Sequence, residues 1–157
     1  MSRESSIVVR RSVTVAASPQ RAFDVFTTAI DTWWPRSHHI GGREQFTAVV
    51  EPHVGGRWLE RGDDGSECDW GRVRVWDPPA RVVLTWEIGA DWKANPDVVS
   101  EVEVRFVAEG DGRTRVELEH RGIEVYGEQA EQMRETFEGP GAWQGILDLF
   151  AGGIAAS

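Results

Sequence analysis

Hydrophobic and polar residues alternate with a period of two through the middle of the chain. In the segment 114–121, Val116, Leu118 and His120 share one face, and Arg115, Glu117 and Glu119 share the other. Such alternation is typical of antiparallel strands that bury one face and expose the other. The predicted strands are Ile7–Val15, Phe46–Val50, Arg57–Arg61, Glu67–Trp76, Arg81–Ile88, Val98–Val107 and Thr114–Arg121.

Helical spacing appears at two places, after the first strand and at the C-terminus. Ser18 and Pro19 form a typical helix start, with a capping hydroxyl followed by proline at the first helical position. An apolar stripe follows and stops at Pro35; its members are Phe23, Phe26, Ile30, Trp33 and Trp34. The spacing therefore predicts one helix between Ser18 and Pro35.

The C-terminal region predicts a polar helix over Glu128–Phe137, then a break at Gly139-Pro140-Gly141, then a second helix over about 142–154. The second helix carries an apolar stripe of Trp143, Ile146, Leu147, Phe150 and Ile154. The order of elements predicts an α+β fold in one domain over residues 1–157. The last helix is available to cover the apolar face of the sheet.

Several short motifs, in this order, resemble the SRPBCC superfamily, which is also called START-like or birch-pollen-allergen-like. They are Ser18-Pro19-Gln20-Arg21-Ala22-Phe23, Trp33-Trp34-Pro35, Glu51-Pro52 with Gly55-Gly56, Trp70-Gly71, Trp76-Asp77-Pro78-Pro79, Leu84-Thr85-Trp86 and Trp143. Within the superfamily the chain is most similar to the activator of heat-shock-protein-90 ATPase homologue group. The likeness extends from about Ile7 to Phe150.

This resemblance implies a helix-grip fold, in which a curved seven-stranded antiparallel sheet surrounds a C-terminal helix and small helices follow the first strand. It also implies a cavity between sheet and helix, used by members to bind or transfer hydrophobic molecules, cyclise polyketides or act as co-chaperones. The group has no universal catalytic motif, so the fold follows from the likeness more directly than the activity does. The break at Gly139–Gly141 shortens the gripping helix and is expected to widen the mouth of the cavity.

Composition narrows the possible partners. The chain has 157 residues, a formal net charge of −9 and a sequence pI near 4.9, and its arginines are interleaved with acidic residues. A nucleic-acid-binding surface needs clustered basic residues, so no nucleic-acid partner is expected. No apolar run reaches the length of a membrane span, and Cys68 has no second cysteine to pair with. We expect a cytoplasmic protein without a cofactor.

Eight tryptophans suggest either a bulky core or an aromatic-lined pocket. Trp33 and Trp34 precede a glycine-containing loop and favour a pocket or its rim. Trp58 and Trp86 are expected on the concave face, and Trp143 begins the covering helix. The predicted ligand-binding residues are Trp33, Trp34, His39, Trp58, Glu60, Trp86, His120 and Trp143.

Three polar side chains are candidates for acid–base chemistry inside the cavity. His120 shares a face with Val116 and Leu118, Glu60 shares one with Trp58, and Asp69 is expected on the face of Gly71. An ionisable group turned into an apolar cavity has a perturbed pKa and is a site candidate. The alternative interpretations are that His120 is a hydrogen-bonded structural histidine and that Glu60 and Asp69 pair with arginines at a sheet edge.

No metal site is expected. His38 and His39 are adjacent in a loop, only His53 and His120 remain, and the fixed geometry of a zinc site needs three or four ligands. The loop His38–Gly42 is instead predicted to form a mobile entrance to the cavity, with an ordinary polar loop as the alternative.

Three functions remain open at this point. The first is binding of a small hydrophobic or aromatic molecule in the cavity. The second is an enzyme of the cyclase, dehydratase or hydrolase type acting there through Glu60, Asp69 or His120. The third is a co-chaperone-like stress-response protein with a chaperone partner. A homodimer is compatible with all three.

Overall fold

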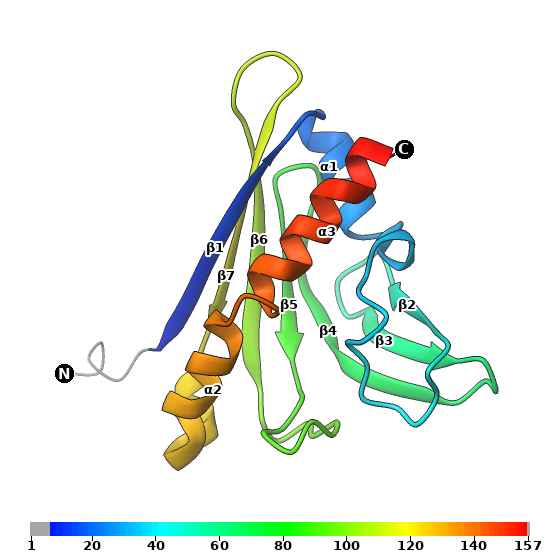
Figure 1. Cartoon of the computed structure of the whole chain (residues 1–157), viewed down its shortest axis with the longest axis vertical. Coiled ribbons are helices and arrows are strands. Elements are labelled where there is room, and N and C mark those ends of the chain that lie inside the picture. Colours follow the sequence, from blue (N-terminus) through cyan, green and yellow to red (C-terminus); the bar gives the residue numbers. More distant parts are fainter. Residues whose placement is uncertain (1–6, 157) are drawn as a thin grey trace.

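Seven strands form one curved antiparallel sheet. The computed structural model describes residues 7–156, and residues 1–6 and 157, the ends of the domain expected over 1–157, lie outside the described residues. The strands are β1 (Val8–Val15), β2 (Phe46–Val50), β3 (Arg57–Gly62), β4 (Glu67–Asp77), β5 (Arg81–Trp86), β6 (Ser100–Ala108) and β7 (Thr114–Arg121). Their order in the sheet is β1-β7-β6-β5-β4-β3-β2, and Figure 1 shows how the sheet curls. The predicted α+β helix-grip fold is confirmed.

The helical segment after β1 is shorter than the sequence predicts. Helix α1 (Pro19–Phe26) begins as expected, with Ser18 Oγ accepting the Arg21 N–H at 3.2 Å, but it ends at Thr27. A separate 3-10 turn, η2 (Ile30–Thr32), carries the chain to Trp33. The Thr27 hydroxyl donates to the Phe23 carbonyl at 2.7 Å, and this β-branched residue disfavours continuation of the helix. The single helix expected from Ser18 to Pro35 is therefore wrong in its second half.

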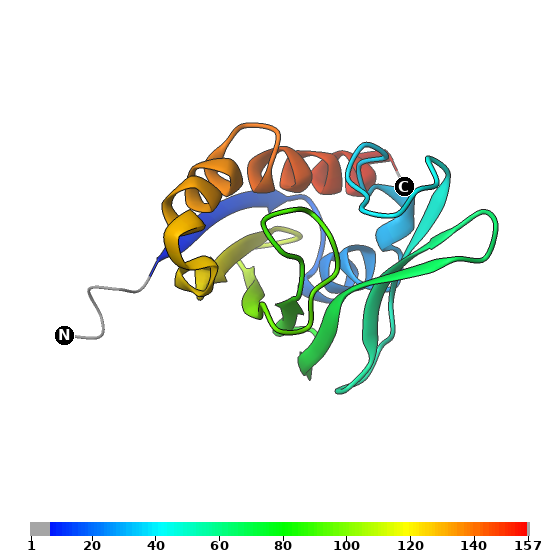
Figure 2. The same ribbon diagram turned by 90° about the horizontal axis from the view of Figure 1, so that it is seen from below.

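The C-terminal elements form a layer over the concave face of the sheet. They are the 3-10 segment η3 (Ile123–Gln129), α2 (Ala130–Glu138) and α3 (Trp143–Ala156), with the predicted break between the last two. Figure 2 shows this layer lying across the sheet. Leu147 and Phe150 of α3 are fully buried, and Phe150 meets Phe26 of α1 with ring centroids 5.2 Å apart. None of the helices within residues 7–156 is long and apolar enough to cross a bilayer.

A β-bulge in β4 changes which residues face inward. Trp58 pairs with Gly71 and Leu59 pairs with Asp69, so Trp70 is an extra residue in β4 opposite the Trp58–Leu59 step. An extra residue reverses the alternation of faces beyond it. Trp70 is consequently buried, although strict alternation through the strand would place it on the solvent face.

Candidate functional site

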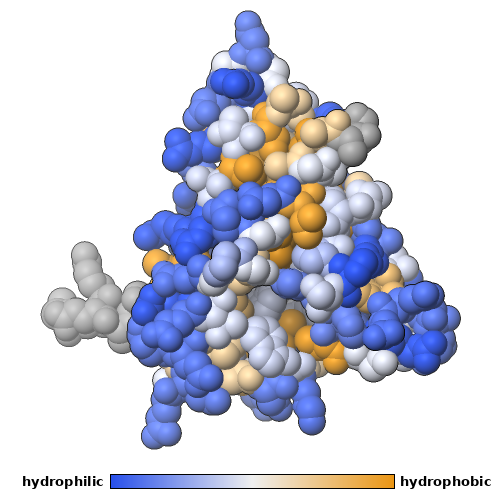
Figure 3. Space-filling model, in the orientation of Figure 1, coloured by the Kyte–Doolittle hydropathy of each residue, from blue (hydrophilic) through white to orange (hydrophobic). Residues whose placement is uncertain are grey.

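A cavity of about 420 Å³ lies where the junction of α2 and α3 meets the sheet. The space-filling view shows a recess beside this junction (Figure 3). The wall is formed by five tryptophans, one phenylalanine, aliphatic residues and a few polar groups: Trp34, Trp70, Trp86, Trp92, Trp143, Phe137, Ile40, Ile88, Ile146, Ala142, Gly139, Gly141, Ser37, His38, His39 and Thr136. No Lys, Arg, Asp or Glu is among them. The cavity is thus aromatic and without a formally charged side chain.

Hydrogen bonds from indole N–H groups fix three of these rings. Trp34 Nε1 donates to the His38 carbonyl at 2.9 Å, and Trp70 Nε1 donates to Glu60 Oε1 at 2.9 Å. Trp143 Nε1 donates to His120 Nδ1 at 3.0 Å. The polar atom of each of these three rings has a protein acceptor, which leaves the faces of the ring as an apolar surface.

The hydrogen bond from Trp143 also determines which ring nitrogen of His120 carries the proton. An indole N–H only donates, so Nδ1 of His120 is the acceptor, and the neutral ring carries its proton on Nε2. Nε2 lies 2.8 Å from Ser100 Oγ, to which it donates. Complete burial lowers the pKa of His120 from 6.5 to about 3. His120 is therefore neutral at physiological pH and does not accept the Ser100 proton.

Glu60 anchors the predicted entrance loop, residues 38–42, of which His38, His39 and Ile40 line the cavity. Its carboxylate accepts the Ile40 N–H at 2.6 Å and the Gly41 N–H at 3.0 Å, in addition to the Trp70 indole N–H. The side chain is buried as predicted, and its two oxygens are occupied by three donors. Glu60 thus joins β3, the entrance loop and the wall residue Trp70.

The predicted ligand-binding residues divide into two groups. Trp34, His39, Trp86 and Trp143 line the cavity. Trp33, Trp58, Glu60 and His120 are buried behind it and do not line it. For Trp33 the expectation of a pocket or rim position is wrong, because its ring packs between Phe26 and Phe150 and its N–H donates to the Val25 carbonyl at 2.7 Å.

Asp69 is not on the concave face. It is half-exposed and accepts hydrogen bonds from Arg57 Nε at 3.1 Å and from Arg57 Nη2 at 2.6 Å. The bulge at Trp70 reverses the alternation on which the prediction was based. Glu60, Asp69 and His120 therefore do not form one polar cluster, and rings of Trp58 and Trp86 lie between Glu60 and His120.

Sequence reasoning missed several residues of the wall. The inward position of Trp70 does not follow from alternation, because the bulge in β4 interrupts it. Trp92 lies in the loop between β5 and β6, where no periodicity applies. Phe137 was recognised only as the end of a polar helix; its ring lies 4.4 Å from that of His120 and 5.6 Å from that of Trp86. The break at Gly139–Gly141 was a usable signal, because both glycines line the cavity.

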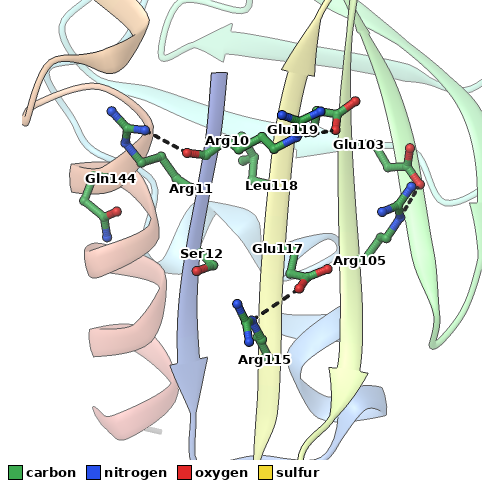
Figure 4. Close-up of a pocket in the computed structure, with 10 residues that line it drawn as sticks. All are labelled: Arg10, Arg11, Ser12, Glu103, Arg105, Arg115, Glu117, Leu118, Glu119 and Gln144. Atoms are coloured by element: carbon green, nitrogen blue, oxygen red, sulfur yellow. Dashed lines mark hydrogen bonds and ion pairs between the residues drawn. The ribbon is translucent and has the colours of Figure 1, made fainter. Parts of the chain in front are cut away.

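A second hollow, of about 530 Å³, lies along strands β1, β7 and β6 beside the start of α3 and is strongly charged. Figure 4 shows three of its arginines beside glutamates, whereas Arg11 is bonded to the backbone carbonyl of Arg10. Arg10 Nε lies 3.0 Å from Glu119, and Arg115 Nε lies 3.2 Å from Glu117. Three of its four arginines pair with its three glutamates, and Arg11 donates to the backbone carbonyls of Arg10 and Glu138. The hollow is therefore lined mainly by surface ion pairs. No cluster of three or more potential metal ligands occurs among the residues that the structure describes.

The comparison with protein families agrees with this architecture. The family model described as "Activator of Hsp90 ATPase homolog 1-like protein" matches residues 16–151, which is most of the chain. The chain belongs to this family. Its membership confirms the resemblance to the SRPBCC superfamily that the sequence motifs suggested.

Solved structures show what this member of the Hsp90-activator homologue family is similar to. An anthrahydroquino-γ-pyrone synthase, Txn09, solved in complex with SUM, is 43% identical; the match covers 94% of this chain and 97% of that one, with a TM-score of 0.66. The self-sacrificing resistance protein CalC of Micromonospora echinospora is 31% identical over 96% and 95%, with a TM-score of 0.67.

An Hsp90 activator from Plasmodium falciparum is 21% identical over 90% of this chain and 91% of that one, with a TM-score of 0.59, and it shares the fold. No curated protein matches the sequence at a significant level.

Proposed function

We propose that the protein binds a small hydrophobic or aromatic molecule in the cavity between the sheet and the α2–α3 junction. The observation that carries the proposal is the wall itself, in which five indole rings surround about 420 Å³ with no formal charge. Small-molecule sites are typically concave, mostly apolar and of 300–1,000 Å³. A structural core would close such a space, since interiors are packed with few voids larger than a water molecule.

The two most similar solved structures named above support this proposal. One is a synthase whose name contains a fused aromatic pyrone, and the other is a resistance protein. Both are more than 30% identical to this chain over nearly its full length. A flat aromatic compound is therefore the appropriate first probe.

The test is a titration with 1,8-dihydroxyanthraquinone, followed by quenching of tryptophan fluorescence. Wild-type protein is expected to show saturable quenching. Ala142→Phe adds a ring to the wall and should weaken binding at least tenfold, whereas Ala155→Phe makes the same change at an exposed position near the far end of α3. Absence of saturable quenching in wild-type protein would contradict the proposal, and so would equal affinity of the two variants for the probe.

A second candidate function is ring closure in the same cavity, favoured by the 43% identity to a synthase. A γ-pyrone ring closes when a phenol oxygen attacks the far carbonyl of an aryl 1,3-diketone, forming a C–O bond, and water then leaves. Holding the diketone folded contributes by proximity, and a base at the phenol assists.

His39 is the best-placed base for that step. The Gly41 carbonyl can only accept, so His39 Nδ1 at 3.0 Å carries the ring proton. His39 Nε2 is then a free lone pair, without a hydrogen-bond partner within residues 7–156, on a residue that lines the cavity. Neither Glu60 nor His120 offers such a free atom, because their polar atoms are already bonded.

Conversion of 1-(2-hydroxyphenyl)butane-1,3-dione to 2-methylchromone, measured by absorbance, tests this second function. His39→Gln should slow the conversion by about 10²-fold or more, the usual size of a general-base contribution. His53→Gln is the matched control, since His53 is exposed and outside the cavity. If wild-type protein does not exceed the uncatalysed rate, ring closure is excluded for this substrate class.

The chaperone and homodimer hypotheses remain predictions. The Hsp90 activator from Plasmodium falciparum is 21% identical, so its likeness concerns the fold and does not extend to its partner.

A further inference from the structure

Trp92 differs from every other tryptophan in this protein. It is 43% exposed, whereas the other tryptophans are buried or half-buried, and it still contributes to the wall of the cavity. Its indole meets Phe137 edge to face, with centroids 6.3 Å apart and planes at 82°. One large ring is therefore kept at the mouth of the cavity, only partly covered by protein.

The backbone of Trp92 is in the left-handed region. Its φ is 62°, and it is the sole non-glycine residue with positive φ in the described part of the chain. A bulky aromatic residue is strained in this region, where glycine or asparagine is found more often. Such strain persists where the surrounding structure enforces it, and it is concentrated at functional positions.

The loop that carries Trp92 is held in place by several hydrogen bonds. Ile88 and Ala94 form an isolated bridge, Gly89 N–H donates to the Lys93 carbonyl at 2.9 Å, and Trp92 N–H donates to the Gly89 carbonyl at 2.9 Å. Figure 2 shows this loop rising from the sheet toward the helical layer. The ring is thus presented by a turn whose conformation would suit glycine.

The charge of the site also restricts the ligand. The wall has no Lys or Arg to pair with an anion and no Asp or Glu to pair with a cation. Transfer of an unpaired charge into an apolar site is costly, and the net charge of −9 further disfavours anions.

We propose that Trp92 is the residue that determines the specificity of the cavity for ligand shape: its ring stacks on one face of the ligand and selects flat aromatic molecules, while the wall without formal charges favours neutral ones. This inference rests on the proposed binding function and deepens it. A flat ligand offers Trp92 a face to stack on, whereas a bulky or twisted molecule of equal size does not. This role accounts for the exposed side chain and the strained backbone of Trp92, because a bound ligand completes the packing of its ring.

Isothermal titration calorimetry with three probes of similar size tests the proposal. The probes are 1,8-dihydroxyanthraquinone, which is flat and neutral; triphenylmethanol, which is neutral but propeller-shaped; and anthraquinone-2-sulfonate, which is flat but anionic. Wild-type protein should bind the first at least tenfold more tightly than either of the others.

Trp92→Gly separates a binding role from a structural one. Glycine relieves the strained backbone, so the thermal midpoint should stay unchanged or rise. Affinity for 1,8-dihydroxyanthraquinone should fall about fivefold to tenfold, the size of one aromatic stacking contact, while affinity for triphenylmethanol stays the same. Trp92→Phe should keep most of the preference for the flat probe. Trp76→Phe, which changes a tryptophan outside the cavity, should leave all three affinities unchanged.

The outcomes distinguish this inference from the function on which it rests. Binding of none of the probes by wild-type protein would remove the binding function and the inference with it. Equal affinity for flat and propeller-shaped probes would remove the inference alone. A fall of several degrees in the midpoint of Trp92→Gly, or unchanged affinity for the flat probe, would make Trp92 a structural residue.

Discussion

His120 illustrates how neighbours decide whether an inward-facing histidine can act in acid–base chemistry. Its Nδ1 accepts the Trp143 indole N–H, its Nε2 donates to Ser100, and its ring packs against Phe137. Protonation would place a second proton where Trp143 already donates. The residue is consequently a fixed support for Trp143 and Phe137, two rings of the cavity wall.

The neutral state of His120 makes a prediction for the pH dependence of stability. Its pKa is about 3 in the folded protein and about 6.5 when unfolded, so the unfolded state binds more protons in between. The contribution of His120 to the free energy of unfolding is therefore fully present above pH 6.5 and is lost as the pH falls toward 3. Between pH 7 and pH 5 the loss amounts to about 2 kcal/mol. Urea unfolding of wild type and His120→Gln should show a stability difference that shrinks by this amount. A constant difference would contradict the buried neutral state.

The sequence supports some side-chain placements and misleads about others, for a local reason. Alternation correctly turns Trp86 and His120 inward, because β5 and β7 pair regularly with β6 around them. It also turns Glu60 inward, because β3 pairs regularly with β2 and the extra residue of the bulge lies in β4. It fails at Asp69, where the extra residue Trp70 reverses the faces. Trp92 could not be placed at all, since a loop has no periodicity and its position depends on a contact with distant Phe137.

At the scale of elements, the convex face of the sheet is held by a network of ion pairs centred on Glu103 of β6. The side chain is 4% exposed and lies 2.6 Å from Arg121, 2.9 Å from Arg105 and 3.1 Å from Arg81. Burial raises the pKa of Glu103, but hydrogen bonds from Arg121, Arg81 and Arg105 outweigh that effect and lower it from 4.5 to about 2.

Glu103→Gln should lower the free energy of unfolding by about 1–2 kcal/mol at pH 7. The expected cost is no larger because the arginines are partly exposed and water screens their charges. The effect is present above pH 4.5 and should vanish as the pH falls toward 2, since wild-type Glu103 then becomes protonated. Glu117→Gln is the matched control on the same face: Glu117 is 40% exposed and pairs with Arg115, so its loss should cost about 0.5 kcal/mol or less. Equal losses in chemical denaturation would show that the network has no special centre.

Substitution of alanine for glycine is expected to have opposite effects on stability at Gly71 in the sheet and at Gly152 in α3. A Cβ at Gly71 would lie 1.8 Å from the Thr85 carbonyl oxygen, whereas a Cβ at Gly152 meets nothing within 4 Å. Gly71→Ala should thus cost about 3 kcal/mol or prevent folding, because β4 and β5 must separate. Gly152→Ala in the exposed face of α3 should gain about 0.5–1 kcal/mol from helix propensity. Thermal midpoints measure both, and a harmless Gly71→Ala would refute the close approach of the strands.

At the scale of the whole molecule, secondary structure was more predictable than the cavity it encloses. Seven strands and the break between α2 and α3 follow from alternation, glycine and proline. The cavity, in contrast, depends on how the α2–α3 junction, the entrance loop anchored by Glu60 and the Trp92 turn meet in space. Those three segments are distant in sequence, and no local pattern reports on their contact.

This convergence makes the stability of the entire domain sensitive to the ligand. A molecule that binds the folded protein alone adds about 2.7 kcal/mol at a concentration of 100 times its Kd. For a domain of this size that corresponds to a rise of roughly 5–10 °C in the thermal midpoint. Glu60→Gln replaces one acceptor oxygen by an NH₂ group that faces backbone N–H donors, so the entrance loop should loosen and the ligand-induced rise should shrink. Arg43, which pairs with exposed Asp63 nearby, provides the control, because Arg43→Gln leaves the cavity wall intact. A full ligand-induced rise in Glu60→Gln would mean that the entrance loop closes the cavity without its carboxylate anchor.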